Sequence, residues 1–242
     1  MWDLRLRDAA WGTRIGVMGV RDSLTAAGFR MCRGVFDLGE IEALRVEANA
    51  VATAAGTACV RHLRSRSKVF AELSSSSRLL GLLPGGLRPV RSILFDKTPD
   101  ENWPVAWHQD LTKAVAEEQE IPGYGPWSWK DGHAHVQPPA ELLAQMVTIR
   151  LHLDDTPAAN GALRVIPGSH KRGKLSGDAV TQVDQGLAVA CECYAGDVLL
   201  MSPLIIHSSR RSTKPMRRRV IHFEYAREKD LDSRLRWLET RA

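Results

Sequence analysis

The sequence predicts a mainly β protein with flanking helices, whose strands form an antiparallel sandwich or barrel. From residue 89 onward, short segments of β-forming residues follow one another and are separated by turn signals. Residues 147–154 alternate between apolar and polar side chains, which is the pattern of a strand with one apolar face. The part of the chain before residue 89 carries apolar residues at helical spacing instead.

The first part of the chain, about residues 1–88, is expected to be a helical preface to the sheet. Apolar side chains recur near the helical period at Leu38, Ile41, Leu44 and Val46, and an alanine-rich stretch follows. The chain has 242 residues, of which 44% are hydrophobic and 25% charged, and no stretch resembles an interdomain linker. We therefore expect a single domain over residues 1–242.

The β core is expected to span about residues 89–226. Its predicted strands are residues 90–97, 106–110, 146–154, 162–166, 187–194, 198–202 and 219–226. Asn160 and Gly161 tolerate a positive φ, so we expect them in a tight hairpin. Residues 111–139 have the pattern of a long irregular insertion, and segments of that length in compact domains are typically lids or binding loops.

His108-Gln109-Asp110 is the first motif that carries chemistry. Residues two apart on an extended strand point to the same side, so the imidazole and the carboxylate can converge on one metal ion. His207 ends an apolar run, residues 198–206, which we expect to be a buried strand. Two imidazoles and one carboxylate form a facial triad that leaves positions open on iron(II). Closed zinc sites use Cys/His spacings that this chain lacks.

An arginine-rich strand start follows His207, at Arg217, Arg218 and Arg219. A guanidinium at this place can form a bidentate pair with a dicarboxylate whose other end chelates the metal. A metal triad combined with such an arginine is what 2-oxoglutarate chemistry requires.

These motifs together resemble the phytanoyl-CoA dioxygenase family, and the resemblance covers most of the chain. It rests on residues 27–36, 107–110, 153–155, 160–170 and 196–198, and on His207. The resemblance implies a double-stranded β-helix, a jelly-roll or cupin-like core. It also implies iron(II), 2-oxoglutarate and O2 as cofactor and cosubstrates.

The family pattern makes His108, Asp110 and His207 the iron ligands. Its cosubstrate arginine lies eleven residues beyond the second histidine, which selects Arg218. Arg217 and Arg219 remain alternatives, because one residue of loop variation would exchange them.

Weaker parts of the resemblance imply further contacts. Gln109 and Ser209 are expected near the cosubstrate, and Arg150 on the strand that faces it. Arg150 stands where some members carry a bulky aromatic residue, so its contact is with 2-oxoglutarate or with the substrate. Asp110 argues against halogenation, because halogenating relatives have a small residue at that position.

The insertion is expected to cover the substrate. Its candidate contacts are Trp127, Trp129, Lys130 and His135. The pair His133 and His135 is an alternative second metal site, although no carboxylate has a matching spacing. His152, His170 and His222 are expected to be structural, hydrogen-bonded residues.

The resulting expectation is an iron(II)- and 2-oxoglutarate-dependent dioxygenase. It would hydroxylate, or otherwise oxidise, a small molecule of secondary or amino-acid metabolism and release succinate and CO2. One alternative is a cupin-type metal enzyme that does not use 2-oxoglutarate, for which Arg218 would be dispensable. Another is a non-catalytic β-barrel that binds a ligand or nucleic acid through basic residues, with strongly salt-dependent binding.

Bulk properties disfavour several other classes. The net charge of +5 comes from basic residues spread along the chain, so we expect no nucleic-acid partner. Neither a membrane-spanning run nor the apolar block of a signal peptide is evident, which predicts a cytoplasmic protein with no membrane partner. The four cysteines are expected to be reduced thiols, with Cys191 and Cys193 as packing residues. The pattern predicts no particular oligomeric state.

Overall fold

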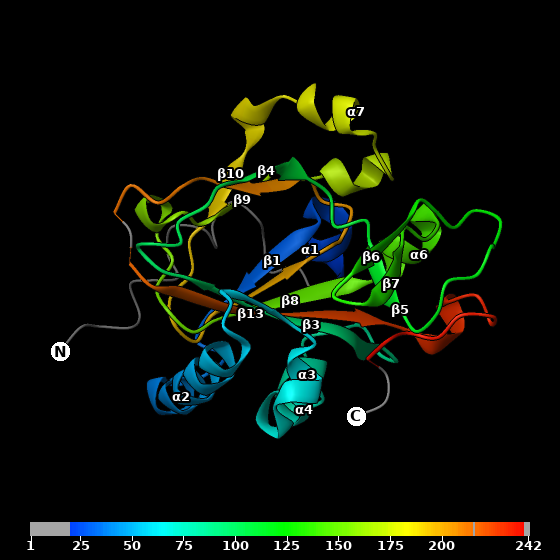
Figure 1. Ribbon diagram of the computed structural model, residues 1–242. Helices are drawn as coiled ribbons and strands as arrows, with labels where there is room; N and C mark the ends of the chain where they lie inside the picture. The colour runs from blue at the N-terminus through cyan, green and yellow to red at the C-terminus, as the bar shows by residue number, and fades with distance from the viewer. Residues whose placement is uncertain (1–19, 215, 240–242) are drawn as a thin grey trace.

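Two antiparallel sheets form the centre of the protein (Figure 1). The computed structural model describes residues 20–214 and 216–239. The larger sheet contains, in spatial order, β1 (Phe29–Cys32), β11 (Val198–Met201), β8 (Val147–His152), β13 (Arg218–Ala226), β3 (Arg88–Lys97) and β2 (Cys59–Arg61). The smaller sheet contains β10 (Val189–Cys191), β9 (Leu163–Val165), β12 (His207–Ser209) and β4 (Val105–His108). This arrangement confirms the predicted mainly β fold with a jelly-roll core, although neither sheet closes on itself.

Helices cover the outer face of the larger sheet (Figure 1). They are α2 (Leu38–Ala55), α3 (Leu63–Arg66) and α4 (Lys68–Ser74). The remaining helices are α1 (Val20–Ala27), α5 (Ser77–Leu80), α6 (Ala140–Gln145) and α7 (Gly177–Thr181), with 3-10 turns at Ala158–Asn160, Ser169–Arg172, Gln185–Leu187 and Glu228–Asp230. The expected preface is thus not wholly helical, because β1 and β2 lie within it as edge strands of the larger sheet. Its residues before Val20 lie outside the described part of the chain.

Local signals account for α2. Asp37 accepts a hydrogen bond from the backbone N–H of Glu40, and Glu40 accepts one from the N–H of Asp37, which is a complete capping box. Gly56 ends the helix with φ 61°. The buried face consists of Ile41, Leu44, Ala48 and Val51. Two residues expected on that face, Leu38 and Val46, are 71% and 63% exposed, because the helical period places them toward solvent.

The two faces of β8 have different partners. Val147, Ile149 and Leu151 pack in the cluster beneath the helices, as the apolar alternation predicts. The polar face is also buried: Thr148 is 0% and His152 is 1% exposed. It is turned toward the smaller sheet, so the polar side chains of the larger sheet point into the space between the sheets.

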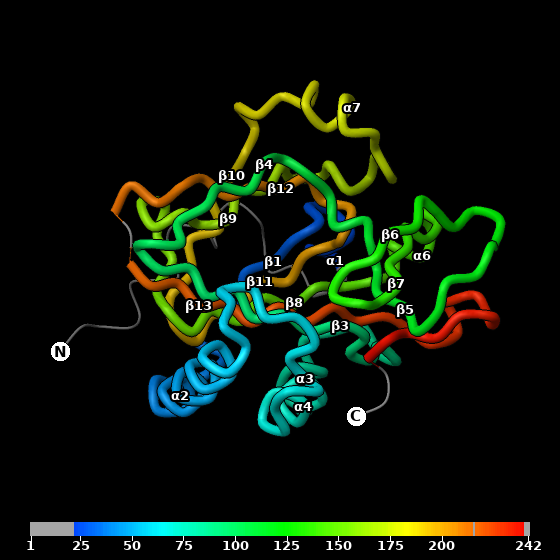
Figure 2. Tube along the Cα trace, in the orientation of Figure 1, coloured from blue at the N-terminus to red at the C-terminus, as the bar shows by residue number. Residues whose placement is uncertain are grey.

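The chain crosses between the sheets before His207. The apolar run 198–206 was expected to be one strand, and that expectation is wrong. β11 ends at Met201 in the larger sheet and β12 begins at His207 in the smaller one (Figure 2). Pro203 lies in the connection and has no N–H to give to a strand ladder.

The segment around Gly161 makes a similar crossing. Gly161 does have a positive φ, 71°, as the sequence predicts. It connects β8 of the larger sheet to β9 of the smaller sheet, however, and not the two strands of a hairpin.

The insertion 111–139 is more ordered than its sequence suggests. It forms a separate antiparallel sheet in which β7 (His133–Val136) lies between β5 (Lys113–Val115) and β6 (Trp127–Lys130). Its apolar side chains pack with Leu231, Leu235 and Trp237 from the end of the chain. These strands have only three or four residues each, and the contact with the distant C-terminal segment has no local sequence signal.

All four cysteines are free thiols, and Cys191 and Cys193 are buried in the apolar cluster between the sheets, as predicted. Within the described residues, no helix combines the length and the apolar character needed to cross a bilayer. The cytoplasmic location stays a prediction.

Candidate active site

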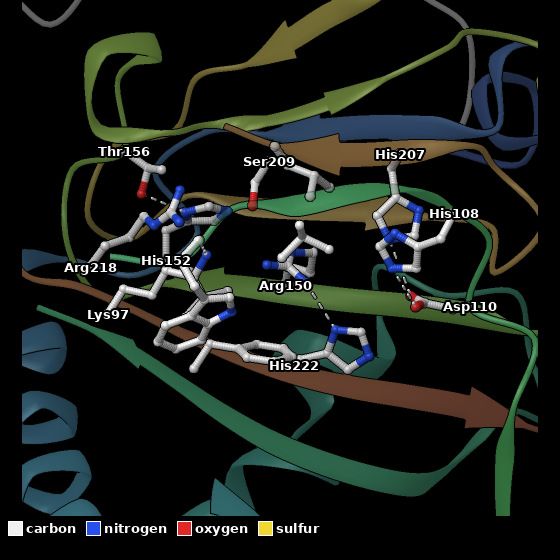
Figure 3. Close-up of a pocket in the computed structure, with 15 residues that line it drawn as sticks. Lys97, His108, Asp110, Arg150, His152, Thr156, His207, Ser209, Arg218 and His222 are labelled. Atoms are coloured by element: carbon white, nitrogen blue, oxygen red, sulfur yellow. Dashed lines mark hydrogen bonds and ion pairs between the residues drawn. The ribbon is translucent and has the colours of Figure 1, made fainter. Parts of the chain in front are cut away.

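A cavity of about 170 Å³ lies between the two sheets (Figure 3). Its apolar lining comes from Phe95, Trp103, Val105, Leu163 and Val220. Its polar and charged lining comes from Lys97, His108, Asp110, Arg150, His152, Thr156, His207, Ser209, Arg218 and His222. The cavity therefore contains three lysine and arginine side chains, Lys97, Arg150 and Arg218, against one carboxylate, Asp110.

His108, Asp110 and His207 converge at one end of this cavity (Figure 3). Nε2 of His108 lies 3.5 Å from one carboxylate oxygen of Asp110, and Nε2 of His207 lies 3.6 Å from the other. The two histidines face each other across the β4–β12 pairing, with ring centroids 4.1 Å apart. Among the described residues this is the one group of three potential ligands whose donor atoms all lie within 4.8 Å.

Backbone contacts orient both imidazoles. Nδ1 of His108 is 2.8 Å from the carbonyl oxygen of Ala106, and Nδ1 of His207 is 2.9 Å from that of Ile205. A carbonyl oxygen only accepts, so each Nδ1 carries a proton, and in the neutral form of either ring the Nε2 lone pair is directed toward Asp110.

The protonation state of the group suits a metal ion. Burial lowers the pKa of His207 to about 4, although the carboxylate of Asp110 opposes this shift. Burial of Asp110 is outweighed by His207 and His108, which hold its pKa well below its ordinary value. At neutral pH the structure thus presents a neutral imidazole and an ionised carboxylate. Two nitrogen donors and one oxygen donor, with the cavity beside them, fit iron(II) with open coordination positions.

The three consecutive arginines have different surroundings. Arg217 makes a bidentate pair with Asp96, through N–O distances of 2.9 and 2.7 Å. Arg219 makes a bidentate pair with Asp154, at 2.8 and 2.7 Å. Arg218 lies between them in the chain, lines the cavity, and has no carboxylate partner among the described residues. Of the three, only Arg218 is therefore placed to receive an anionic ligand.

Arg218 and Lys97 lie directly opposite each other on β13 and β3. Like charges at such positions destabilise a sheet. Burial, then Arg150, lowers the pKa of Arg218 to about 10, and burial with Arg218 and Arg150 lowers that of Lys97 to about 7. The ammonium of Lys97 donates to the backbone carbonyl of Trp103, at 2.6 Å, and it forms no ion pair with a carboxylate of the described residues. This end of the cavity fits an anionic group.

Ser209 and Arg150 also line the cavity. In Figure 3 both lie between Arg218 and the histidine pair. Ser209 follows His207 by two residues on β12, and Arg150 extends from the polar face of β8.

Gln109 does not lie at the cavity, in contrast to the expectation from the sequence. Its side-chain amide donates to the carbonyl oxygens of Gly173 and Leu204, at 2.8 and 2.6 Å, and its oxygen accepts from the N–H of Leu175 at 2.9 Å. Its neighbours His108 and Asp110 face the cavity, so alternation turns Gln109 the other way. All its hydrogen-bonding groups tie the neighbouring loop to the sheet.

The four expected substrate contacts, Trp127, Trp129, Lys130 and His135, do not line the cavity either. Trp129 is 62% exposed and donates to Glu118. Trp127 packs against the core of the small third sheet, and His135 is fully buried there. Of these four residues, Lys130 has an electrostatic link to the cavity: its pKa is lowered mainly by burial, and the charge of Asp110 opposes this shift.

Four polar residues of the cavity lining were not expected there: Lys97, His152, Thr156 and His222. His152 and His222 are hydrogen-bonded, as predicted, through Thr156 for His152 and through Arg150 for His222. Strand parity was the available signal, because His152 shares a face with Arg150 and His222 shares a face with Arg218.

This fold and site define a jelly-roll protein with a His-Asp-His triad suited to a metal ion and, in the same cavity, an arginine without a carboxylate partner among the described residues. The family model of phytanoyl-CoA dioxygenase (PhyH) matches residues 24–220, so the chain belongs to the phytanoyl-CoA dioxygenase family, as its motifs predicted. Membership of this family confirms the expected enzyme class, an Fe(II)/2-oxoglutarate-dependent oxygenase. No curated protein sequence matches the chain.

Several solved structures share the fold. HygX from Streptomyces hygroscopicus, solved with nickel and 2-oxoglutarate, is 21% identical with a TM-score of 0.60 and covers 84% of each chain. The epimerase SnoN, solved with Fe3+, α-ketoglutarate and nogalamycin RO, is 21% identical with a TM-score of 0.65 and covers 85% of this chain and 81% of its own. The carbocyclase SnoK from nogalamycin biosynthesis is 18% identical with a TM-score of 0.64 and covers 90% and 86%. At these identities the likeness concerns the fold.

Proposed function

We propose that this protein oxidises a small-molecule substrate with iron(II), 2-oxoglutarate and O2, and that hydroxylation is the reaction. His108, Asp110 and His207 would hold the metal, and Arg218 with Ser209 would bind the distal carboxylate of 2-oxoglutarate. The observation that carries the proposal is one cavity between the two sheets. The triad of Nε2 and carboxylate donors lies on the side of the smaller sheet, and the buried guanidinium of Arg218, which has no carboxylate partner among the described residues, lies on the side of the larger sheet.

The bound cofactors would supply the oxidising chemistry, in which substrate R–H, 2-oxoglutarate and O2 give R–OH, succinate and CO2. The chain's own residues bind and orient. The carbonyl contacts of His108 and His207 fix their ring orientation, and Arg218 provides two parallel N–H donors for a carboxylate. The apolar side chains of Phe95, Trp103 and Val220 exclude water from the cavity.

The relatives indicate that the outcome of the reaction can vary. SnoN is described as an epimerase and SnoK as a carbocyclase, both dependent on α-ketoglutarate. HygX has been solved with hygromycin B, and SnoN with a nogalamycin compound. These examples support a small-molecule substrate for this chain.

The test is an anaerobic titration of metal-free protein with iron(II) and then 2-oxoglutarate, followed by the visible charge-transfer absorption of the chelate. Wild type should develop the band, and His108→Ala should not. Arg218→Met should need about tenfold or more additional 2-oxoglutarate, because a charged bidentate pair is lost. Arg217→Met is the matched control, since this arginine pairs with Asp96, and it should behave as wild type.

Absence of the band in folded wild-type protein would refute the proposal and favour a binding barrel. A band that needs no more 2-oxoglutarate in Arg218→Met than in wild type would refute the assignment of the distal carboxylate to Arg218.

A further inference from the structure

Arg150 is held in the cavity by a polar contact with the neighbouring strand. Its Nη1 lies 3.2 Å from Nδ1 of His222, which is its direct cross-strand partner (Figure 3). A guanidinium only donates, so Nδ1 of His222 accepts, and the ring proton of this neutral histidine is on Nε2. Nε2 is 3.3 Å from a carboxylate oxygen of Glu224, which accepts that proton. Two successive hydrogen bonds therefore link Glu224, His222 and Arg150. The first fixes the tautomer of His222, and the second fixes the direction of the Arg150 guanidinium.

Glu224 is the anchored end of this hydrogen-bond chain, which we call the relay. It is 1% exposed and pairs with the ammonium of Lys113 at 2.6 Å and with the guanidinium of Arg91 at 3.1 Å. Lys113 and Arg91 outweigh burial and hold the pKa of Glu224 well below its ordinary value. Arg91 also donates to the carbonyl oxygen of Thr112. Glu224 thus stays ionised and is anchored to the segment that directly follows Asp110.

Arg150 itself has unused donor capacity. Its Nε is buried and has no acceptor in the described part of the chain, where its guanidinium also forms no ion pair. Burial lowers the pKa of Arg150, and the charge of Asp110 opposes this shift without cancelling it. One face of the guanidinium lies over the ring of Phe95, 5.4 Å from the centroid. The side chain of Arg150 is half-buried, and a cation withdrawn from water without an ion-pair partner is costly, so this arrangement fits a site whose anion arrives with the ligand.

The place of Arg150 identifies that anion. In Figure 3 it lies between Arg218 and the histidine pair. Electrostatics agree with this position. The charge of Arg150 lowers the pKa of His207 at one end of the cavity and those of Arg218 and Lys97 at the other. A five-carbon diacid that extends from Arg218 to the triad must pass Arg150.

We propose that Arg150 binds the carboxylate of 2-oxoglutarate next to its keto group, and that His222 and Glu224 are positioning residues that aim this arginine. The inference rests on the proposed function. It assigns one guanidinium to each carboxylate: Arg218 to the distal one and Arg150 to the one on the metal side.

Pyruvate separates the two assignments, because it keeps the keto acid end and lacks the distal carboxylate. Binding of pyruvate and of 2-oxoglutarate to the anaerobic iron(II) protein is measured by calorimetry. Arg150→Met should weaken both ligands by about tenfold, the effect of one charged hydrogen-bonded pair. Arg218→Met should weaken 2-oxoglutarate and leave pyruvate unchanged. Unchanged pyruvate affinity in Arg150→Met would overturn the assignment. Arg150 would then be a candidate contact of the substrate.

His222 is tested with a matched pair of substitutions. His222→Leu removes the acceptor and should reproduce much of the loss seen in Arg150→Met for both ligands. The amide oxygen of His222→Asn can take the place of Nδ1, so this variant should retain most of the affinity. Melting temperatures are recorded in parallel. Reduced stability with unchanged affinity in His222→Leu would reduce His222 to a packing residue and overturn the relay.

The outcomes for wild type separate the two proposals. Wild type that binds neither pyruvate nor 2-oxoglutarate with iron(II) refutes the proposed function and this inference with it. Wild type that binds both ligands, together with Arg150→Met that binds them equally well, refutes the inference alone. Arg150 lies on the cavity wall, and Arg150→Met leaves the ion pairs of Glu224 with Lys113 and Arg91 in place. We therefore expect this variant to fold.

Discussion

At the wall of the cavity, the guanidinium of Arg218 lies next to the place where a side chain at Gly161 would be. A Cβ on Gly161 would lie 3.1 Å from Nη1 of Arg218 and 2.7 Å from the carbonyl oxygen of Arg210. Because residue 161 has no side chain, the guanidinium of Arg218 can occupy the adjacent space. The backbone requires glycine for a second reason, because its φ of 71° lies in the left-handed region.

Substitution of Gly161 should therefore affect both stability and cosubstrate binding. We expect Gly161→Ala to lower the free energy of unfolding by about 1–3 kcal/mol and to weaken 2-oxoglutarate, because Arg218 has to move. Gly132→Ala is the control, since Gly132 has φ 77° but no atom within 4 Å of the place that an added Cβ would take. It should lose stability with no change in 2-oxoglutarate affinity. Equal 2-oxoglutarate affinity in the two variants would contradict the contact with Arg218.

Gln109 should be needed for stability and not for ligand binding. Gln109→Leu leaves the part-buried N–H of Leu175 and the carbonyl oxygens of Gly173 and Leu204 without their side-chain partner, which we expect to cost about 3 kcal/mol. Urea unfolding measures this loss, and calorimetry should give an unchanged 2-oxoglutarate affinity. A stable variant with weakened 2-oxoglutarate binding would restore the role that the sequence suggested.

Lys97 should give the protein a defined pH dependence of stability. Its pKa is lowered to about 7 by burial, Arg218 and Arg150, whereas an unfolded lysine titrates near ~10.4. Between these values the unfolded chain binds more protons, so the free energy of unfolding rises with pH. Below pH 7 the full penalty of the buried ammonium applies. Lys97→Met should thus be more stable than wild type by roughly 2 kcal/mol at pH 6, with a gap that shrinks toward pH 9.

Urea unfolding of the metal-free protein at several pH values from 6 to 9 measures this effect. Lys68→Met is the control, because the side chain of Lys68 is 89% exposed. It should show no pH-dependent difference from wild type. A constant gap between Lys97→Met and wild type across the range would contradict the depressed pKa.

Metal binding should stabilise the protein through Asp110. Iron(II) added anaerobically at a hundredfold excess over its Kd should raise the free energy of unfolding by about 2.7 kcal/mol, which is read as a higher melting temperature. Asp110→Asn should lose most of this shift, because a neutral amide replaces the anionic ligand. His133→Ala tests the alternative pair, His133 and His135, and should keep the full shift. A full shift in Asp110→Asn together with a lost shift in His133→Ala would instead place the metal site at His133 and His135 in the insertion.

The sequence by itself determined the features that depend on near neighbours. The capping box of Asp37 and Glu40 and the positive φ of Gly56 define α2 within a few residues. The apolar alternation of Val147, Ile149 and Leu151 defines β8, because side chains two apart share one face of a strand. The same rule brings His108 and Asp110 together, although Asp110 lies two residues beyond the end of β4.

Only the tertiary structure decided which face of each strand meets which neighbour. Alternation separates Arg218 from Arg217 and Arg219, but the carboxylates of Asp96 and Asp154 had to be brought near in space before one guanidinium was left for the cavity. Likewise, the polar face of β8 reads as a solvent face until the second sheet covers it. The physical reason is that a strand pattern has a period of two and carries no information about what lies opposite. That information arises from the register of strands distant in sequence, and the register sets the partners of Arg150, Gln109 and Arg218.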